Sequence, residues 1–470
     1  MRNTSGKWQG DADTQLSLQQ DSSGFSLLNP DGSVERYDLT SKILSNTNRA
    51  GQVTAYGYDA SGRVSILTDP FGRALTFSYD ANNHVASVTD SAGKVTIYGY
   101  DANKNLSQVT FPDGTGKLYH YENTSFPHHL TGISYVSASG TVTRYATYAY
   151  DTNGLAVSTE HAGGQEKATL SYDSATQTTV TDGVGTRKIF TFAPNLGVKN
   201  LAALLNLADN KVLNQTFDAN NNLKCKQDEE GHVTTWTYNT SNQKTAETRG
   251  QGGSCAAPVP TAATRTTTYQ YLSSTLDLPT QIQSPSVYAG SFKSVTIGYS
   301  GNLPATITQS GFTPSGASVS RTVTLGYNAN GQVTSIDGPR ADVADVTTLA
   351  YNNCTTGGGC GQLQRVTNAL GHVTTYDSYD ANGRLLQMTD PNGVRTVYTY
   401  DPRGRVWSVT QSAPGGGSRV TTYGYDAAGN VTSTTLPTGL SLTYTYNAAQ
   451  YLTRVTDSLG NYIDYGYDLK

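Results

Sequence analysis

The chain has 470 residues and a formal net charge of −4, and charged residues make up only 14% of it, against roughly 25% in typical soluble domains. The near balance of 32 basic and 36 acidic residues gives no electrostatic reason to expect nucleic acid or an anionic membrane surface as a partner. With 48 Gly and 32 Tyr beside 10 Phe, 3 Trp and 2 Met, the composition is unlike that of an ordinary globular enzyme and favours extended β-structure.

The first segment, residues 1–36, is expected to be a β-hairpin that leads into the rest of the chain. Residues Met1 to Gln20 are polar and lack the apolar stretch of a secretory signal. No later segment approaches the roughly 18 consecutive apolar residues of a membrane span. We therefore expect a soluble chain with no signal peptide and no membrane span.

A tyrosine followed by an acidic residue recurs at a constant spacing in the second segment, residues 37–182. The pairs begin at Tyr37, Tyr58, Tyr79, Tyr100 and Tyr121, and each follows the previous one by 21 residues. A fixed period of this length indicates a repeat architecture. The pairs at Tyr150 and Tyr172 follow at longer steps, so the segment reads as a regular repeat with some longer loops.

Each unit is expected to contain two strands and two turns. The segment Asp59-Ala60-Ser61-Gly62 has Asp at the first turn position, where its carboxylate can accept backbone N–H bonds, and Gly at the fourth, where positive φ is tolerated. Asp69-Pro70-Phe71-Gly72 adds a proline at the second position, which suits a type I turn. Between the turns, Leu75, Phe77 and Tyr79 alternate with small polar residues, which predicts antiparallel strands joined as hairpins.

The third segment, residues 183–378, is expected to be an irregular stretch of the same repeat with longer loops. The spacing of 21 returns between Phe217 and Tyr238, and degenerate units end at Tyr271, Tyr299, Tyr327 and Tyr351. Helix signals are nearly absent. Leu201 to Ala208 is the one segment that could form a helix, and a strand in a degenerate repeat is the alternative.

Four cysteines, Cys225, Cys255, Cys354 and Cys360, permit three disulfide pairings. Cys354 and Cys360 enclose a Gly-rich loop, and a local disulfide between them is one expectation. Free thiols in a reduced compartment remain an alternative. Zinc binding is less favoured, because no two cysteines have the spacing of a zinc knuckle and no histidine lies beside them.

The last segment, residues 379–470, is again regular and is expected to be truncated, because Tyr467-Asp468 opens a turn whose glycine does not follow. The residues that we expect to build the repeat throughout the chain are Tyr58, Asp59, Gly62, Asp69, Gly72, Tyr79, Asp80, Tyr100, Asp101, Tyr379, Asp380, Gly383, Asp390, Gly393, Tyr400 and Asp401.

The expected fold is all-β: one continuous sheet of antiparallel hairpins, wound into a curved or spiral shell that need not be complete. Eighteen units of two strands give about 36 strands, and one turn of such a ribbon would surround a space roughly 50 Å across. Open sheets of this size curl or split. A β-propeller or a β-solenoid is the alternative, although a propeller should repeat at 42 residues and consecutive units look alike at 21.

The recurring pattern Gly-x-Val or Leu, then Thr-Asp-x-x-Gly, then Tyr-x-Tyr-Asp resembles the YD repeat of Rhs proteins, and it is clearest from Gly383 to Asp401. The resemblance extends from about Ser33 to Lys470. Similar repeats occur in the C subunits of insecticidal toxin complexes and in teneurins. The resemblance implies a β-sheet that spirals into a hollow shell around a C-terminal toxin in bacterial members, or that serves cell-surface recognition in teneurins.

One part of the family pattern has no counterpart here. Rhs cores end in a segment with self-cleaving aspartates that precedes the variable toxin. Asp401 to Arg405 is superficially similar to that segment, but it occupies an ordinary turn of a unit.

The sequence gives no sign of an enzyme, a cofactor or a metal site. The repeated aspartates recur at turns, whereas a glycosidase needs one unique pair. His120, His128 and His129 with Glu122 form the densest histidine group, for which solvated loop residues are the commoner explanation. Residues 183–188 only faintly resemble a phosphate loop and are expected to be a turn. A hydrolase in residues 183–278 is the least favoured hypothesis.

We therefore expect a scaffold that forms part of a shell around a C-terminal polymorphic toxin. Its partners would be the rest of the same polypeptide or the toxin cargo, with a secretion-system or shell protein as a further partner. It would be secreted or displayed on the cell surface through a bacterial export system. The alternative is a cell-surface adhesion or carbohydrate-binding module that uses exposed tyrosine rows, although cross-strand tyrosine ladders explain those rows more simply.

Overall fold

A computed structural model describes residues 14–469, and most of them belong to a single antiparallel sheet of 40 strands. Each strand pairs with the next one in the chain, except that β22 continues to β24 and the two-residue β23 pairs with β22 alone. The terminal strands β1 and β40 each have one partner, so the sheet does not close into a barrel. The prediction of a continuous all-β hairpin sheet is confirmed, and a propeller of separate blades is excluded.

Sixteen strands lie between residues 14 and 182: β1 (Ser17–Asp21), β2 (Gly24–Leu28), β3 (Val34–Tyr37), β4 (Ile43–Thr47), β5 (Val53–Tyr58), β6 (Val64–Thr68), β7 (Ala74–Tyr79), β8 (Val85–Thr89), β9 (Val95–Tyr100), β10 (Leu106–Thr110), β11 (Gly116–His120), β12 (Gly132–Val136), β13 (Val142–Tyr150), β14 (Ala156–His161), β15 (Gln165–Ser174) and β16 (Gln177–Asp182). The sole helical element of residues 14–469 is the 3-10 turn η1 (Ala162–Gly164).

The middle of the chain continues the sheet with several longer strands: β17 (Arg187–Asn195), β18 (Val198–Asn206), β19 (Lys211–Phe217), β20 (Leu223–Gln227), β21 (Val233–Tyr238), β22 (Lys244–Gly253), β23 (Pro258–Val259), β24 (Arg265–Ser273), β25 (Leu276–Pro285), β26 (Phe292–Ser300), β27 (Leu303–Phe312), β28 (Ser318–Tyr327), β29 (Val333–Asp337), β30 (Val346–Tyr351) and β31 (Leu363–Thr367). The segment Leu201 to Ala208 therefore lies mostly in a strand, β18, that pairs with β17 and β19.

Nine strands complete the sheet: β32 (Val373–Tyr379), β33 (Leu385–Thr389), β34 (Arg395–Tyr400), β35 (Val406–Ser412), β36 (Ser418–Tyr425), β37 (Val431–Thr435), β38 (Ser441–Tyr446), β39 (Leu452–Asp457) and β40 (Tyr462–Asp464). Residues 1–13 of the expected N-terminal hairpin, and Lys470, lie outside the described residues. Within residues 14–469, no helix has the length and apolar character that crossing a bilayer requires.

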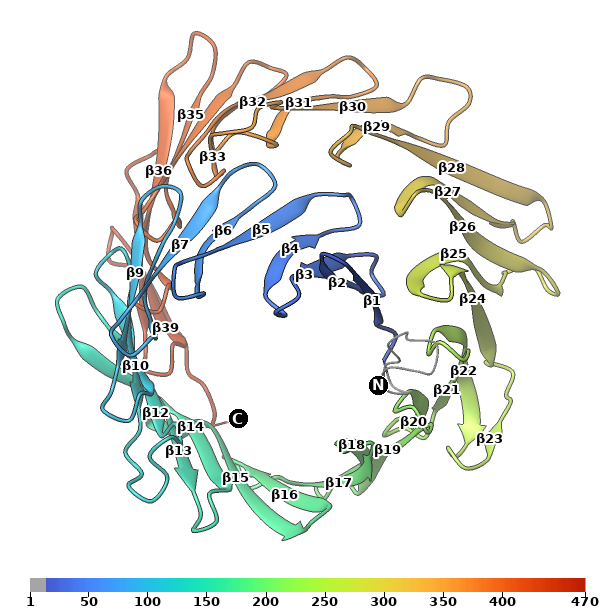
Figure 1. The fold of residues 1–470 in the computed structure, drawn as a ribbon, viewed down its shortest axis with the longest axis horizontal. Coiled ribbons are helices and arrows are strands. Elements are labelled where there is room, and N and C mark those ends of the chain that lie inside the picture. The colour runs from blue at the N-terminus through green and yellow to red at the C-terminus, as the bar shows by residue number, and fades with distance from the viewer. Residues whose placement is uncertain (1–13, 470) are drawn as a thin grey trace.

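The sheet winds into a spiral around an open centre (Figure 1). Its second pass lies against its first, beginning where the N–H of Asp277 donates to the carbonyl of Pro30 (2.8 Å). We call residues 14–276 coil 1 and residues 277–469 coil 2. The turn between β8 and β9 lies against the turn between β32 and β33, where Asn382 bonds to Asp90 (2.7 Å).

Coil 1 contains β1 to β24, and 23 of these strands form the wall, because β23 pairs with β22 alone. At roughly 4.8 Å per strand, this gives a circumference of about 110 Å and a diameter on the order of 35 Å. The sequence-based figure of roughly 50 Å assumed one turn of the whole ribbon. The spiral is narrower because the ribbon overlaps itself.

The wall is one sheet thick and has little interior. Among the described residues only seven hydrophobic side chains are buried: Val109, Ala146, Cys225, Val233, Leu278, Cys360 and Ala449. Most other side chains are half-buried by their neighbours on the same face. The fold is thus held mainly by ladder hydrogen bonds and cross-strand pairs, and less by a packed core.

Candidate functional site: the edges of the wall and the seam between coils

Most tyrosine-aspartate pairs end a strand and open a tight hairpin loop, which we call a Tyr-Asp turn. In the turn after β5, the N–H of Gly62 donates to the carbonyl of Asp59 (2.9 Å), and Gly62 has φ +77°. Such three-residue loops combine a type I turn with a left-handed residue. The Oδ1 atom of Asp59 accepts the backbone N–H groups of Ser61 and Arg63, each at 2.9 Å. The bonds from Arg63 are the main reason that the pKa of Asp59 lies below its ordinary value.

The other predicted repeat residues occupy equivalent positions. Asp69, Asp80, Asp101, Asp380, Asp390 and Asp401 each accept the backbone N–H of the residue four positions later. Gly72, Gly383 and Gly393 all have positive φ. At Asn83, which stands where the pattern has Gly, φ is +67°, a conformation that Asn tolerates better than most residues.

The tyrosines of the Tyr-Asp turns tie neighbouring hairpins together, a role that the sequence analysis missed. Tyr79 donates its hydroxyl hydrogen to the carbonyl of Val64 (2.7 Å), at the adjoining end of the neighbouring strand. Tyr58, Tyr100 and Tyr400 make the same bond fifteen residues back, and Tyr379 makes it sixteen residues back. No turn joins the two strands at this edge, so the hydroxyl bridges the gap. The constant offset was the available signal.

Cationic side chains extend these links along the same edge. The Arg63 guanidinium lies 4.3 Å from the ring centroid of Tyr79, and Arg384 and Arg405 lie similarly over Tyr400 and Tyr425. Each of these arginines also pairs with the aspartate of its own turn. Burial raises the pKa of Tyr379 to about 12. The Tyr-Asp edge is thus a row of linked aspartate, arginine and tyrosine side chains.

The two coils meet along a seam between unlike edges. All Tyr-Asp turns lie on one edge of the ribbon, and the other turns, which we call opposite turns, lie on the other edge. At the seam, opposite turns of coil 1 contact Tyr-Asp turns of coil 2. The N–H of Ala92 donates to Oδ1 of Asn382 (3.1 Å), and Nδ2 of Asn382 donates to Oδ2 of Asp90 (2.7 Å).

A charged cluster joins the next pair of turns. Arg405 donates from Nη2 to Oδ2 of Asp113 at 2.9 Å, and Arg403 donates from Nη1 to the hydroxyl of Thr115 at 3.4 Å. The side chains are largely enclosed, with exposed fractions of 13% for Asp113, 17% for Arg403 and 20% for Arg405. Desolvation, together with the charge of Arg405, lowers the pKa of Arg403. The seam thus places two guanidinium groups around one carboxylate from the other coil.

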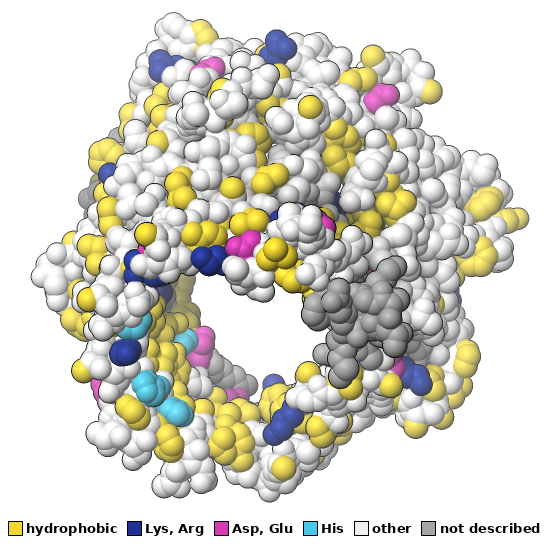
Figure 2. Space-filling model, viewed as in Figure 1, with side chains coloured by type: hydrophobic (Ala, Val, Ile, Leu, Met, Phe, Trp, Pro, Cys, Tyr) yellow, Lys and Arg dark blue, Asp and Glu magenta, His cyan; other side chains and the backbone are white. Residues whose placement is uncertain are grey.

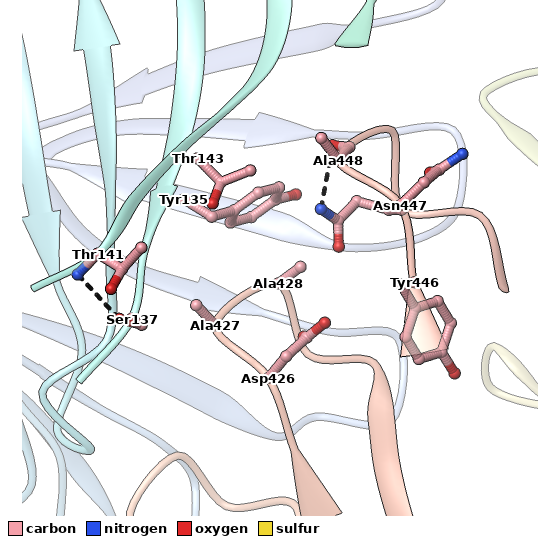
Figure 3. Close-up of a pocket in the computed structure, with 11 residues that line it drawn as sticks. Tyr135, Ser137, Thr141, Thr143, Asp426, Ala427, Ala428, Tyr446, Asn447 and Ala448 are labelled. Carbon is pink, nitrogen blue, oxygen red and sulfur yellow. Dashed lines mark hydrogen bonds between the residues drawn. The ribbon is translucent and has the colours of Figure 1, made fainter. Parts of the chain in front are cut away.

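Further along, the seam opens into a cavity of about 250 Å³ (Figure 3). Tyr135 and Thr143 approach from the β12–β13 hairpin of coil 1, and Asp426, Ala428 and Asn447 approach from Tyr-Asp turns of coil 2. Asp426 already accepts three hydrogen bonds, one from the N–H of Gly429 and two from Asn430. The cavity is therefore a gap between turn tips whose polar groups serve their own loops.

The structure joins all four cysteines in two disulfides, Cys225 with Cys255 and Cys354 with Cys360. The second disulfide closes the loop between β30 and β31, which takes the place of a Tyr-Asp turn at the seam. Arg73 of coil 1 donates from Nη1 to the carbonyls of Gly358 (3.2 Å) and Cys360 (3.5 Å). This cross-coil position had no sequence signal, because 285 residues separate Arg73 from Gly358.

The histidine group is dispersed. His120 Nε2 contacts the hydroxyl of Ser134 (2.8 Å), His128 contacts Asn105 (2.7 Å) and His129 contacts the carbonyl of Gly154 (3.2 Å). In the part of the chain that the structure describes, no three His, Cys, Asp or Glu side chains are grouped as metal ligands would be. Residues 182–186 form a β-turn between β16 and β17, so the weak phosphate-loop resemblance corresponds to a turn.

Comparison with known proteins identifies the repeat. The RHS Repeat family profile matches residues 37–74, 79–115, 361–394, 379–419, 409–441 and 425–462. No curated protein sequence matches the chain.

Several solved structures are similar in fold. The Tc holotoxin pore of Photorhabdus luminescens, with a point mutation in TccC3, is 13% identical over 95% of this chain and 28% of that chain, with a TM-score of 0.48. TcdB2-TccC3 without its hypervariable C-terminal region is 14% identical over 95% and 26%, with a TM-score of 0.43. TcdB2-TccC3-TEV is 13% identical over 94% and 27%, with a TM-score of 0.40. The chain spans little more than a quarter of the length of these structures.

The matched segments include the Tyr-Asp turns whose aspartates, glycines and tyrosines build one edge of the wall, on both sides of the seam. These segments of the chain are therefore RHS repeats.

Proposed function

We propose that this chain is a length of the wall of a hollow β-shell, that the shell encloses a toxin polypeptide, and that the wall itself is not catalytic. One observation carries the proposal: a single continuous sheet of hairpins winds around an open centre (Figure 1). The RHS repeats support a toxin as the class of cargo, released outside the producing cell.

The size of the opening indicates the state of the cargo. A coil on the order of 35 Å across, less about 10 Å for side chains, leaves a passage of roughly 25 Å. A folded domain of 100 residues has a radius of gyration of about 13 Å and is therefore wider than 30 Å. The shell is thus suited to a polypeptide held extended or partly unfolded. Figure 2 shows hydrophobic side chains on the rim of the opening, where they would contact such a chain.

The bonding of the repeat tyrosines also favours a wall over a carbohydrate-binding surface. The tyrosines that close the units donate their hydroxyl hydrogens to backbone carbonyls of neighbouring hairpins. Aromatic platforms for sugars need accessible ring faces, whereas several of these rings carry an arginine side chain. Their hydrogen bonds and cation contacts serve the sheet.

The proposal is tested by protection of a reporter. A disordered segment of about 60 residues with one protease site is fused after Lys470, and the same segment is placed in the exposed turn at residues 413–417 as the matched control. We expect cleavage of the C-terminal reporter to be at least about tenfold slower, because the surrounding wall limits access. Equal cleavage rates at the two positions would refute enclosure.

A further inference from the structure

The loop that carries the Cys354–Cys360 disulfide differs from every regular Tyr-Asp turn in its length and in its contacts. It runs from Asn352 to Gln362, where the regular turn has three loop residues, and its ends are joined by the hydrogen bond from Asn352 N to the carbonyl of Gln362 (2.9 Å). The N–H of Gly361 returns to the carbonyl of Asn352 (2.9 Å). The disulfide holds the intervening residues in a compact fold.

This loop fills the seam. The Phe71 ring of coil 1 lies directly against Gly361, where any side chain would collide with it, and Gly361 has φ +68°. Arg73 donates to the carbonyls of Gly358 and Cys360 while its Nε atom bonds to Asp69. The opposite turn of residues 69–73 thus docks onto the disulfide loop and is held by backbone carbonyls that the loop presents.

The same loop is held from within coil 2. Gln332 donates from Nε2 to the carbonyl of Gly361 (2.6 Å), and Asn352 donates from Nδ2 to the carbonyl of Gly359 (3.1 Å). The carbonyls that receive Arg73 therefore keep their positions only while residues 354–360 keep their fold. A glycine-rich segment has many alternative conformations once its cross-link is removed.

The two cysteines differ in accessibility. Cys354 is exposed, whereas Cys360 is fully buried, with an exposed fraction of 0%. A soluble thiolate therefore meets the sulfur of Cys354 first, and Cys360 is the leaving group. The Cys225–Cys255 disulfide joins β20 to the loop after β22, where Cys255 Sγ lies near the carbonyl of Asn214. It makes no coil-to-coil contact among the described residues and is a natural control.

We propose that the Cys354–Cys360 disulfide is a thiol–disulfide exchange site that controls the seam, and that its reduction releases residues 69–73 from the loop. The reductant is a dithiol. Its thiolate bonds to Cys354 Sγ, the Cys354–Cys360 bond breaks, and Cys360 leaves as a thiolate that takes up a proton. The second thiol of the reductant then displaces Cys354, so that two electrons and two protons pass to the protein and the reductant becomes a disulfide.

This inference goes beyond enclosure, because it concerns how the wall loosens when it meets a reducing compartment. It depends on the wall alone and needs no cargo. A shell that encloses nothing can still show it, and a shell that protects its cargo can lack it. The two proposals therefore fail separately.

The test is amide hydrogen exchange of residues 69–73 in the full chain, before and after treatment with dithiothreitol. Using the Cys225→Ser/Cys255→Ser variant leaves one disulfide, whose reduction adds about 2 Da to the intact mass. We expect exchange in residues 69–73 to accelerate at least about tenfold on reduction, and exchange in residues 111–115 to change less than about twofold. The Cys354→Ser/Cys360→Ser variant should exchange fast at residues 69–73 without reductant.

Three results would overturn the proposal. The first is unchanged exchange at residues 69–73 although the mass shows reduction. The second is a native chain whose disulfide dithiothreitol does not reduce. The third is a uniform acceleration that includes the distant turn at residues 239–243, since that would mean global unfolding and no local control of the seam.

Discussion

Replacing Asp113 by Asn is the most direct test of the spiral. Asn keeps the acceptor for the Thr115 N–H, which Oδ1 of Asp113 receives at 3.0 Å, so the turn itself is preserved. The substitution removes the negative charge that Arg405 contacts at 2.9 Å and that Arg403 approaches at 4.0 Å. The amide nitrogen that replaces Oδ2 would also face the Arg405 guanidinium, and both groups are hydrogen-bond donors.

The size of the effect follows from the enclosure of these groups. A hydrogen bond to a charged group contributes about 1.5–3 kcal/mol, and more is lost where a charge stays enclosed without its partner. Arg405 keeps a second carboxylate, since its Nε atom bonds to Asp401 at 2.6 Å. We therefore expect the Asp113→Asn variant to lose about 2 kcal/mol of local opening free energy at the seam, which corresponds to roughly 30-fold faster amide exchange.

The matched control is Asp464→Asn, which breaks the pair with Arg454. Both side chains are about half exposed, at 53% and 47%, and exposed pairs contribute about 0–1 kcal/mol. Exchange is measured by mass spectrometry in residues 111–115 and 401–405. Acceleration in only one of the two turns, or an effect no larger than that of the control, would refute the docking of coil 1 on coil 2.

Two further predictions concern the repeat itself. Tyr400→Phe removes the bond to the Leu385 carbonyl and should accelerate amide exchange in β33 and β34 about fivefold, which corresponds to a loss of about 1 kcal/mol of local opening free energy. The control is Tyr398→Phe, because the Tyr398 hydroxyl contacts only the Met388 sulfur at 3.8 Å, and it should change exchange little. Equal effects of the two substitutions would contradict the bridging role. The pKa values of Asp59 and Asp80 are lowered in the folded state, so their stabilisation is present above the ordinary value of 3.8 and is lost as pH falls through the lowered values. The midpoint temperature of thermal unfolding should therefore decrease as the pH drops below 3.8, and it should decrease less in the Asp59→Asn variant. An identical pH profile in that variant would contradict this cause.

The local structure followed from the sequence because its determinants lie within one repeat. A turn such as residues 59–62 depends on an aspartate and a glycine three positions apart, and the strands depend on alternation over six residues. The tyrosine bridges also repeat with a constant offset, but a periodic tyrosine does not reveal whether its ring or its hydroxyl is the essential part. Here the hydroxyl reaches a carbonyl on the next hairpin.

The seam was beyond sequence reasoning for a different reason. The pairing of Ala92 with Asn382 spans 290 residues and depends on how much twist the intervening strands accumulate. In retrospect the third positions of certain turns are unusual: Phe71, Asp113 and Arg403 stand where other turns have Ser, Ala or Asn. The third position does not identify the turns that dock, however, because Ala92 and Asn382 also meet across the seam.

The count of 23 wall strands per coil limits how RHS chains of this kind can change in length. Unlike edges can meet only if that count is odd, because each added strand swaps the edge on which the next turn lies. Deletion of a single strand from residues 116–379 would bring like edges together, whereas loss of one whole unit would preserve the parity and give each turn a new partner. Drift in gene length should therefore proceed by complete repeats, while loops such as residues 338–345, between β29 and β30, can vary without changing the strand count.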